Sequence, residues 1–313
     1  MLVIGRSRGV PKRMKFRAIV KDCKTFATVC NAIKSFLKNA VLKLHKTKMR
    51  LVACPSGGAA SDGAQVWCSF PTAGVLTDVR LEVKTNDAIH LEIPDLGQLV
   101  FALRECAKSA APVIMKLTGG TGARQLVQLA TTTGGSDLVY EVPVRVVSDG
   151  EMASLIMPAI ESGVVNVELP SLDVVMAFAD RMRGLGATQL TVQLTPNPDA
   201  LRAGGGGDDG AAAGDVPTVG LTLTAKAPDM ESEIEYKAVP LIASVAGDDD
   251  GPPTRPVVVS VDLRKFGRCC LVQQLTPTRI WAHLVHERVF VLSAFAGGDT
   301  NFVFYLPAIT VAY

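Results

Sequence analysis

A chain of 313 residues exceeds the ~100 to 200 residues of a typical single domain, so the sequence predicts two domains, each able to bury a core. Hydrophobic residues make up 48% of the chain, but no apolar run approaches the ~20 residues of a membrane-spanning helix, which predicts a soluble protein. A formal net charge of +2 excludes a strong whole-molecule field, so any binding to nucleic acid must come from charge placement.

The chain begins with a basic stretch, MLVIGRSRGVPKR, that lacks the apolar core of a secretory signal. We interpret residues 1–13 as a basic N-terminal extension, with a nuclear-import patch or a weak organellar presequence as alternatives. From Met14 onward, alternating apolar residues and turn residues predict one half of the chain in the order β-α-β4-α-β3. Strands are expected over 14–21, 41–54, 64–70, 79–85, 88–94, 112–118, 123–133 and 139–147, and helices over 22–39 and 95–109.

The second half repeats this order of elements with only faint sequence identity. Strands are expected over 164–170, 188–195, 218–227, 233–242, 257–263, 279–286, 288–296 and 301–309, and helices over 171–185 and 262–275. The pattern predicts an α+β fold of two similar domains, 14–147 and 164–313, each with two helices packed on a continuous antiparallel sheet. Between them, 148–163 loses strand alternation and is interpreted as the interdomain connector.

Two stretches rich in Gly, Ala, Asp and Pro, 196–217 and 246–256, have little to bury and are expected to form flexible hairpin loops. They lengthen turns without changing the fold, because loop closure costs only ~0.6 kcal/mol more per doubling of length. Acidic residues gather in these loops, at Asp208, Asp209 and 248–250.

Each predicted helix has an apolar stripe and cations on another face. On the first helix Phe26, Ile33 and Leu37 belong to the stripe, and on the second Asp95 is well placed as the N-cap. The cations on the polar faces are Lys24, Lys34, Lys38, Arg104, Lys108, Arg181, Arg183, Arg264, Lys265 and Arg268. Ordinary solvated faces are the alternative interpretation, but the separation of cations on helices from acids in loops favours a positive surface facing phosphates. Without aromatic residues for stacking, such a surface would contact the backbone of duplex DNA and read no sequence.

The sequence contains few of the residue patterns that are typical of an enzyme active site. Its seven cysteines lack Cys-x-x-Cys spacing and are interpreted as buried, reduced thiols. His283 and His286 are three apart in a strand-like segment, which places them on opposite faces and disfavours a metal site. Gly119, Gly120 and Gly122 lack the Gly-Lys-Ser/Thr ending of a phosphate loop. We therefore predict no catalytic residues, no metal and no cofactor.

Several segments carry a resemblance to a known family. They are MKFRA from Met14, VWCSF from Val66, IHLEI from Ile89, VPVRVV from Val142, FADRMR from Phe178, VDLRKF from Val261, PTRIWAHLVHERVFVLSAF from Pro277 and FYLPAI near the C-terminus. In order and spacing the chain resembles the Hus-one subunit family of the nine-one-one DNA-damage checkpoint clamp, which is related to the replication clamp PCNA. The family pattern begins at MKFRA, so the extension and the two Gly/Asp-rich loops depart from it.

The resemblance implies a non-catalytic, nuclear subunit of a heterotrimeric ring that encircles duplex DNA with a Rad-nine-like and a Rad-one-like subunit. It also implies an ATP-driven clamp loader, checkpoint signalling and tethered repair enzymes. Carried over to this sequence, the ten helix cations would line the hole, and Leu155, Ile156 and Met157 of the connector would border a groove for partner peptides.

A ring also needs unpaired strand edges for contact between subunits, and we expect them near 123–133 in the first half and 233–241 in the second. Two other readings remain open. A homotrimeric replication clamp would share the fold and the basic helices but pair with itself, whereas an interaction scaffold would never contact DNA.

Overall fold

A computed structural model of the protein describes residues 15–55, 63–82, 88–119, 125–158, 164–197, 217–242 and 253–309. The predicted extension 1–13 and most of the two predicted Gly/Asp-rich loops lie outside these ranges. The first half consists of β1 (Lys15–Val20), α1 (Cys23–Phe36), β2 (Ala40–His45), β3 (Lys48–Ala53), β4 (Gln65–Pro71), α2 (Thr72–Val75), β5 (Leu76–Glu82), β6 (Ala88–Ile93), α3 (Leu96–Cys106), β7 (Val113–Gly119), β8 (Gln125–Thr133) and β9 (Ser136–Val146).

A short helix, α4 (Asp149–Ala153), separates the halves. The second half consists of β10 (Val165–Glu168), α5 (Leu172–Gly184), β11 (Gln189–Pro196), β12 (Thr218–Ala227), β13 (Met230–Pro240), β14 (Val257–Asp262), α7 (Leu263–Cys269), the 3-10 helix η1 (Cys270–Leu275), β15 (Arg279–Val285), β16 (Val289–Ala296) and β17 (Thr300–Pro307). The α+β fold with two similar halves is confirmed.

One stretch predicted as a single strand, 41–54, contains two. β2 and β3 pair antiparallel across a turn at Lys46 and Thr47, where the Thr47 backbone N–H donates to His45 Nδ1 at 3.2 Å. The first half therefore has five strands between its long helices, while the second has the predicted four. The turn was missed because LHKTKMR contains neither Gly nor Pro.

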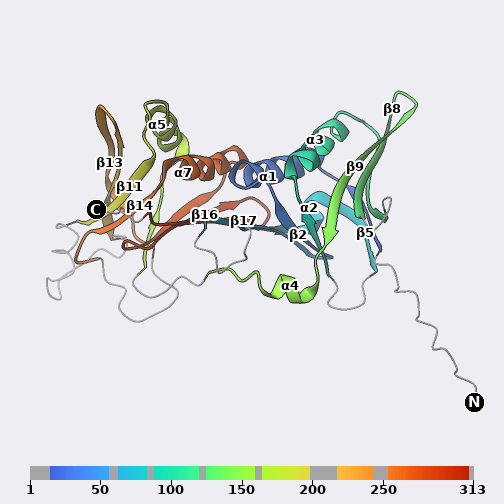
Figure 1. The fold of residues 1–313 in the computed structure, drawn as a ribbon, viewed down its shortest axis with the longest axis horizontal. Helices are drawn as coiled ribbons and strands as arrows, with labels where there is room; N and C mark the ends of the chain where they lie inside the picture. Colours follow the sequence, from blue (N-terminus) through green and yellow to red (C-terminus); the bar gives the residue numbers. More distant parts are fainter. Residues whose placement is uncertain are drawn as a thin grey trace, which may run out of the picture.

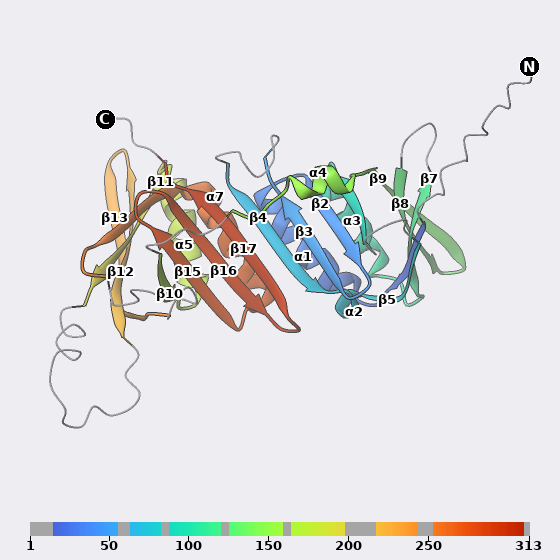
Figure 2. The same ribbon diagram turned by 90° about the horizontal axis from the view of Figure 1, so that it is seen from below.

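Most strands belong to one antiparallel sheet of 13 strands, and four more form a second sheet. The large sheet runs β10-β15-β16-β17-β4-β3-β2-β6-β9-β8-β7-β1-β5, and the small one runs β13-β12-β11-β14. The long helices α5, α7, α1 and α3 lie in a row on one side of this elongated molecule, whereas α4 lies on the opposite side (Figure 1). Seen from below, the strands from β15 to β2 run continuously across the middle of the molecule (Figure 2).

The two halves join where β17 pairs with β4, with Phe302 opposite Cys68 and Phe304 opposite Val66. Above this pair of strands, Phe36 of α1 packs edge-on against Phe304, with ring centroids 5.6 Å apart. All these side chains are buried. The halves thus share a hydrophobic core as well as a strand pairing, so their relative position is fixed by apolar burial.

At each end of the molecule a strand has an edge with no partner along most of its length. β9 pairs with β8 over Ser136–Val144 and meets β6 only at Arg145 and Val146. Among the described strands, β13 pairs along its length with β12 alone. The expected edge at 233–241 is therefore confirmed, whereas the expected edge at 123–133 is wrong, because β8 lies between β7 and β9.

Six of the cysteines are buried and Cys54 is half-buried, and all are free thiols. Burial raises the pKa of the Cys54 thiol to about 11 and that of Cys270 to about 12, so these groups are protonated and unreactive at neutral pH. The predicted burial of the cysteines is confirmed for all of them except Cys54.

His283 is a structural residue of the second half. Its Nδ1 lies 2.7 Å from the amide oxygen of Asn166, and its Nε2 lies 3.0 Å from the Ser293 hydroxyl. A neutral ring fits this arrangement, with Nδ1–H donating to Asn166 and Nε2 accepting from Ser293. Burial lowers the pKa of His283 to about 4, which keeps the ring neutral at physiological pH.

Acidification is expected to destabilise the protein through His283. Because its pKa is lower in the folded state than the ~6.5 of an unfolded chain, the unfolded chain binds the proton more readily, and stability falls as the pH drops from ~6.5 towards 4. The full pKa difference corresponds to about 3 kcal/mol of unfolding free energy. The expected loss is smaller than this because the ring is only partly buried. Urea unfolding between pH 7 and 4.5 should show a smaller loss for His283→Gln than for wild type or the exposed control His286→Gln. Equal pH slopes would contradict this assignment.

Candidate nucleic-acid interface

Local sequence explains why four long helices lie in one row. Each begins at a side-chain cap: Asp22 and Asp95 accept from Thr25 N–H and Gly97 N–H, Ser171 from Asp173 N–H, and Asp262 from Lys265 N–H. The predicted N-cap role of Asp95 is confirmed. The buried residues of each helix repeat at helical spacing, so the opposite faces are left to solvent on the same side of the sheet (Figure 1).

All the predicted helix cations are on or next to these helices, and their exposed positions agree with the apolar stripes predicted for the other face. Exposed among them are Lys24, Lys34, Lys38, Arg104, Lys108, Arg181, Arg183, Arg264 and Lys265, whereas Arg268 is half-buried. They come from both halves of the chain, so one side of the molecule carries cations along its length.

Three of these cations are partly neutralised by neighbouring acids. Lys38 lies 3.4 Å from Asp95, Lys108 lies 2.6 Å from Glu105, and Arg183 lies 3.0 Å from Asp180. Exposed pairs of this kind are weak and give way readily to another anion. The remaining cations form no ion pair within the described part of the chain: Lys24, Lys34, Arg104, Arg181, Arg264, Lys265 and Arg268.

The cations are densest where α5 meets α7. The pKa of Arg268 is lowered, first by burial and then by the positive charges of Arg264 and Arg183. Asp262 offsets only part of this effect. Mutual repulsion among these guanidinium groups disfavours the arrangement in isolation, and a bound anion such as a phosphate would relieve it.

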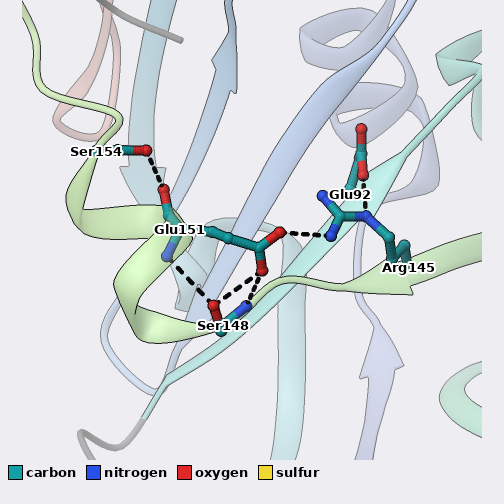
Figure 3. A network of polar contacts seen from close by, with 5 residues as sticks. All are labelled: Glu92, Arg145, Ser148, Glu151 and Ser154. Atoms are coloured by element: carbon teal, nitrogen blue, oxygen red, sulfur yellow. Dashed lines mark hydrogen bonds and ion pairs between the residues drawn. The ribbon is translucent and has the colours of Figure 1, made fainter. Parts of the chain in front are cut away.

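A second candidate region is the connector, whose first turn is held against the sheet by a polar network (Figure 3). Arg145 of β9 donates from Nε to Glu92 at 2.5 Å and from an Nη to Glu151 at 2.6 Å. Glu151 also accepts from the Ser148 backbone N–H at 2.8 Å, completing a capping box for α4. Because Arg145 is the largest influence, followed by Ser148, the pKa of Glu151 falls to about 2.

The connector is anchored again at its far end. The Tyr305 hydroxyl of β17 donates to the backbone carbonyl of Pro158 at 2.7 Å. Between the two anchors, Ile156 and Met157 are 68% and 47% exposed. Leu155 is half-buried and lines a cavity of about 310 Å³ with Val41, Val52, Cys54 and other residues under α4. Of the three predicted groove residues, the structure thus places one against a cavity and two in solvent.

Sequence reasoning missed α4 and its anchor. The Ser148-x-x-Glu151 spacing is that of a capping box and was a usable signal, but no local pattern identifies Arg145 as the partner of Glu92, which is on another strand. The structure also shows no cluster of three or more His, Cys, Asp or Glu side chains suited to a metal ion among its described residues. No helix in the described ranges is long and apolar enough to span a membrane.

This fold is that of a PCNA-like sliding clamp. The chain is similar to the crystal structure of proliferating cellular nuclear antigen from Entamoeba histolytica, with a TM-score of 0.63, 15% identity and coverage of 94% of this chain and 99% of that one. It is also similar to the PCNA2-PCNA3 complex from Sulfolobus tokodaii, with a TM-score of 0.57, 13% identity and coverage of 93% and 98%.

Sequence comparison identifies the branch of this fold. Residues 14–310 match the model of the Hus1-like protein family, and the chain belongs to that non-catalytic family of checkpoint clamp subunits. Checkpoint protein HUS1 of Homo sapiens is 22% identical over 305 residues, covering 95% of this chain and all of that protein. Checkpoint protein hus1 homolog of Dictyostelium discoideum is 19% identical over 300 residues, covering 95% and 99%.

Proposed function

We propose that this protein is one subunit of a heterotrimeric checkpoint ring that encircles duplex DNA at damage sites. The observation that carries the proposal is the β17·β4 junction inside the chain, together with the unpaired edges of β9 and β13 at its two ends. β9, like β17, is the last strand of its half, and β13, like β4, is the fourth. Repeating the internal junction between subunits would therefore pair β9 of one subunit with the β13 equivalent of the next.

In such a ring the helix side would face the hole, and the ten cations from Lys24 to Arg268 would contact the DNA backbone. Their spacing along helices suits phosphates and provides no base readout. A topologically linked ring needs no tight affinity, so loose and salt-dependent contacts are sufficient.

The proposed partners are a Rad-nine-like and a Rad-one-like subunit, an ATP-driven clamp loader and repair enzymes, all acting in the nucleus. The proposed role is to support checkpoint signalling and to tether repair factors. Membership of a checkpoint family and the similarity to the human and Dictyostelium checkpoint proteins support the checkpoint role.

A homotrimeric replication clamp is the second candidate, and the fold similarity to PCNA favours it. Co-expression with candidate clamp subunits followed by native mass spectrometry separates the two. We expect a 1:1:1 complex, whereas a stable self-trimer would move the function to a replication clamp.

We further propose that Leu155, Ile156 and Met157 border a groove for repair-enzyme peptides. In the assembled complex, replacing Ile156 and Met157 with Ser should weaken binding of a fluorescent peptide with apolar anchors from a repair enzyme by about tenfold, because two exposed anchors each contribute on the order of 1 kcal/mol. Ala73→Ser, which changes an exposed apolar side chain on α2, is the control. Equal peptide affinity for all three proteins would contradict the groove.

A further inference from the structure

The closed junction inside the chain shows which side chains a β17·β4 pairing tolerates. On the face of these strands directed away from the helices, the three paired positions are uncharged: Asn301 with Ser69, Val303 with Trp67 and Tyr305 with Gln65. Asn301 and Ser69 are also joined by a side-chain hydrogen bond. The β17·β4 pairing therefore has no like charges facing each other on this side of the sheet.

The two open edges differ from this junction. On β9, Asp137, Val139 and Glu141 alternate with Tyr140, which packs under α3, so they lie on the face away from the helices. On β13, Glu231, Glu233 and Glu235 alternate with inward-packing residues in the same way. Both edges thus present carboxylates on the same face.

The charge on β13 is compensated only in part: Lys237 follows Glu235 by two positions, but no cation stands across from the two central glutamates. Glu231 stands across from Lys226 of β12, but Glu233 and Glu235 stand across from Thr224 and Thr222. Neither glutamate forms an ion pair with any residue that the structure describes. If β13 paired with β9 of another copy, the carboxylates of both strands would lie on the same face of the pair, and like charges across a strand pair are destabilising.

The helices next to the same edges carry exposed apolar side chains that a neighbouring subunit could bury. Phe101 of α3 is 59% exposed and stacks edge-on against Tyr140 of β9, with ring centroids 6.1 Å apart. At the other end, Val174 and Leu185 of α5 are 59% and 47% exposed. Leu185 lies fourteen positions after the N-cap Ser171, and Phe36, which is buried in the internal junction, lies fourteen positions after Asp22. Exposed apolar groups at this position favour burial against a neighbour.

We propose that the edge of β13 selects a different clamp subunit whose contacting strand presents Lys or Arg beside Glu233 and Glu235, and that the acids on β9 and β13 oppose pairing between copies of this chain. This inference rests on the proposed ring and adds the chemistry of the neighbour. The apolar helix layer supplies attraction that is common to all clamp subunits, and the strand charges discriminate among them.

The test is the Glu233→Lys/Glu235→Lys double variant. Its affinity for the subunit that binds at β13, measured by titration of purified proteins, should fall about tenfold, because two attractive cross-strand pairs become repulsive. The same variant alone, at low salt, should self-associate in sedimentation, because lysines on β13 would match Asp137 and Glu141 of another copy. Glu287→Lys/Asp299→Lys, which makes the same charge change in the exposed turns of the β15–β16 and β16–β17 hairpins, is the control and should leave both the affinity and the association state unchanged.

Unchanged affinity of the double variant for the neighbour would overturn the inference, as would a double variant that stays as monomeric as wild type. These outcomes differ from failure of the proposed function. If the wild-type chain binds no clamp subunit at all, the ring is wrong; if it enters the ring and the double variant enters equally well, only the charge selection is wrong.

Discussion

The Phe36→Ala variant is expected to lose about 3–5 kcal/mol of unfolding free energy, the range for removing a buried phenyl ring from a core. Phe36 is buried and packs on Phe304 from the other half, so its loss leaves a cavity at the junction between the halves. Urea unfolding of the purified chain measures the effect. We also expect the transition to broaden, because the two halves would unfold less cooperatively.

Leu185→Ala is the matched control for Phe36→Ala. It truncates the corresponding position at the C-cap of α5, where the side chain is about half exposed, and should cost less than about 1 kcal/mol in the isolated chain. A loss of under 1 kcal/mol for Phe36→Ala, or equal losses for the two variants, would mean that the junction is not a shared core.

Reversing Arg264 and Lys265 to Glu is expected to weaken DNA binding by the assembled complex. Both side chains are exposed on α7 and lack an ion pair within the described residues, so they are free to meet phosphates. Each lost phosphate contact lowers the slope of log affinity against log salt by about 0.9, which gives a decrease of about 2 for the pair. Fluorescence anisotropy with duplexes of unrelated sequence, at several salt concentrations, measures it.

The control for this charge reversal is Lys48→Glu/Arg50→Glu, which makes the same charge change on β3. Both residues are exposed, and their strand neighbours Met49 and Leu51 point into the core beneath the helices. They therefore lie on the face of the sheet away from the helix row. If this control weakened DNA binding as much as the α7 variant, the helices would not be the DNA-facing side.

The helices and their polar faces were predictable because their signals are local. Apolar spacing and the N-cap Asp95 defined α3 within a few residues, and the helix expected over 262–275 is present as α7 followed by η1. It ends at Thr276, which has a left-handed backbone with φ of 45° and precedes Pro277, a residue that cannot continue a helix.

Edges and ion pairs were less predictable because they depend on sheet order and on distant residues. β8 has the same alternating pattern as an edge strand, yet β9 folds back beside it and covers it. The sequence identified β13 as an edge strand. Its acidic residues become informative only when they are compared with the uncharged pairing of β17 with β4. Likewise, Lys38 looks like a free cation in the sequence and is paired with Asp95 in the fold.

The most direct test of the proposed ring is electron cryo-microscopy of the complex co-purified with two clamp partners and bound to duplex DNA. We expect a closed ring in which β9 and β13 pair with neighbouring subunits while α1, α3, α5 and α7 face DNA passing through the hole. An open assembly, or DNA bound on the sheet side near α4, would contradict it.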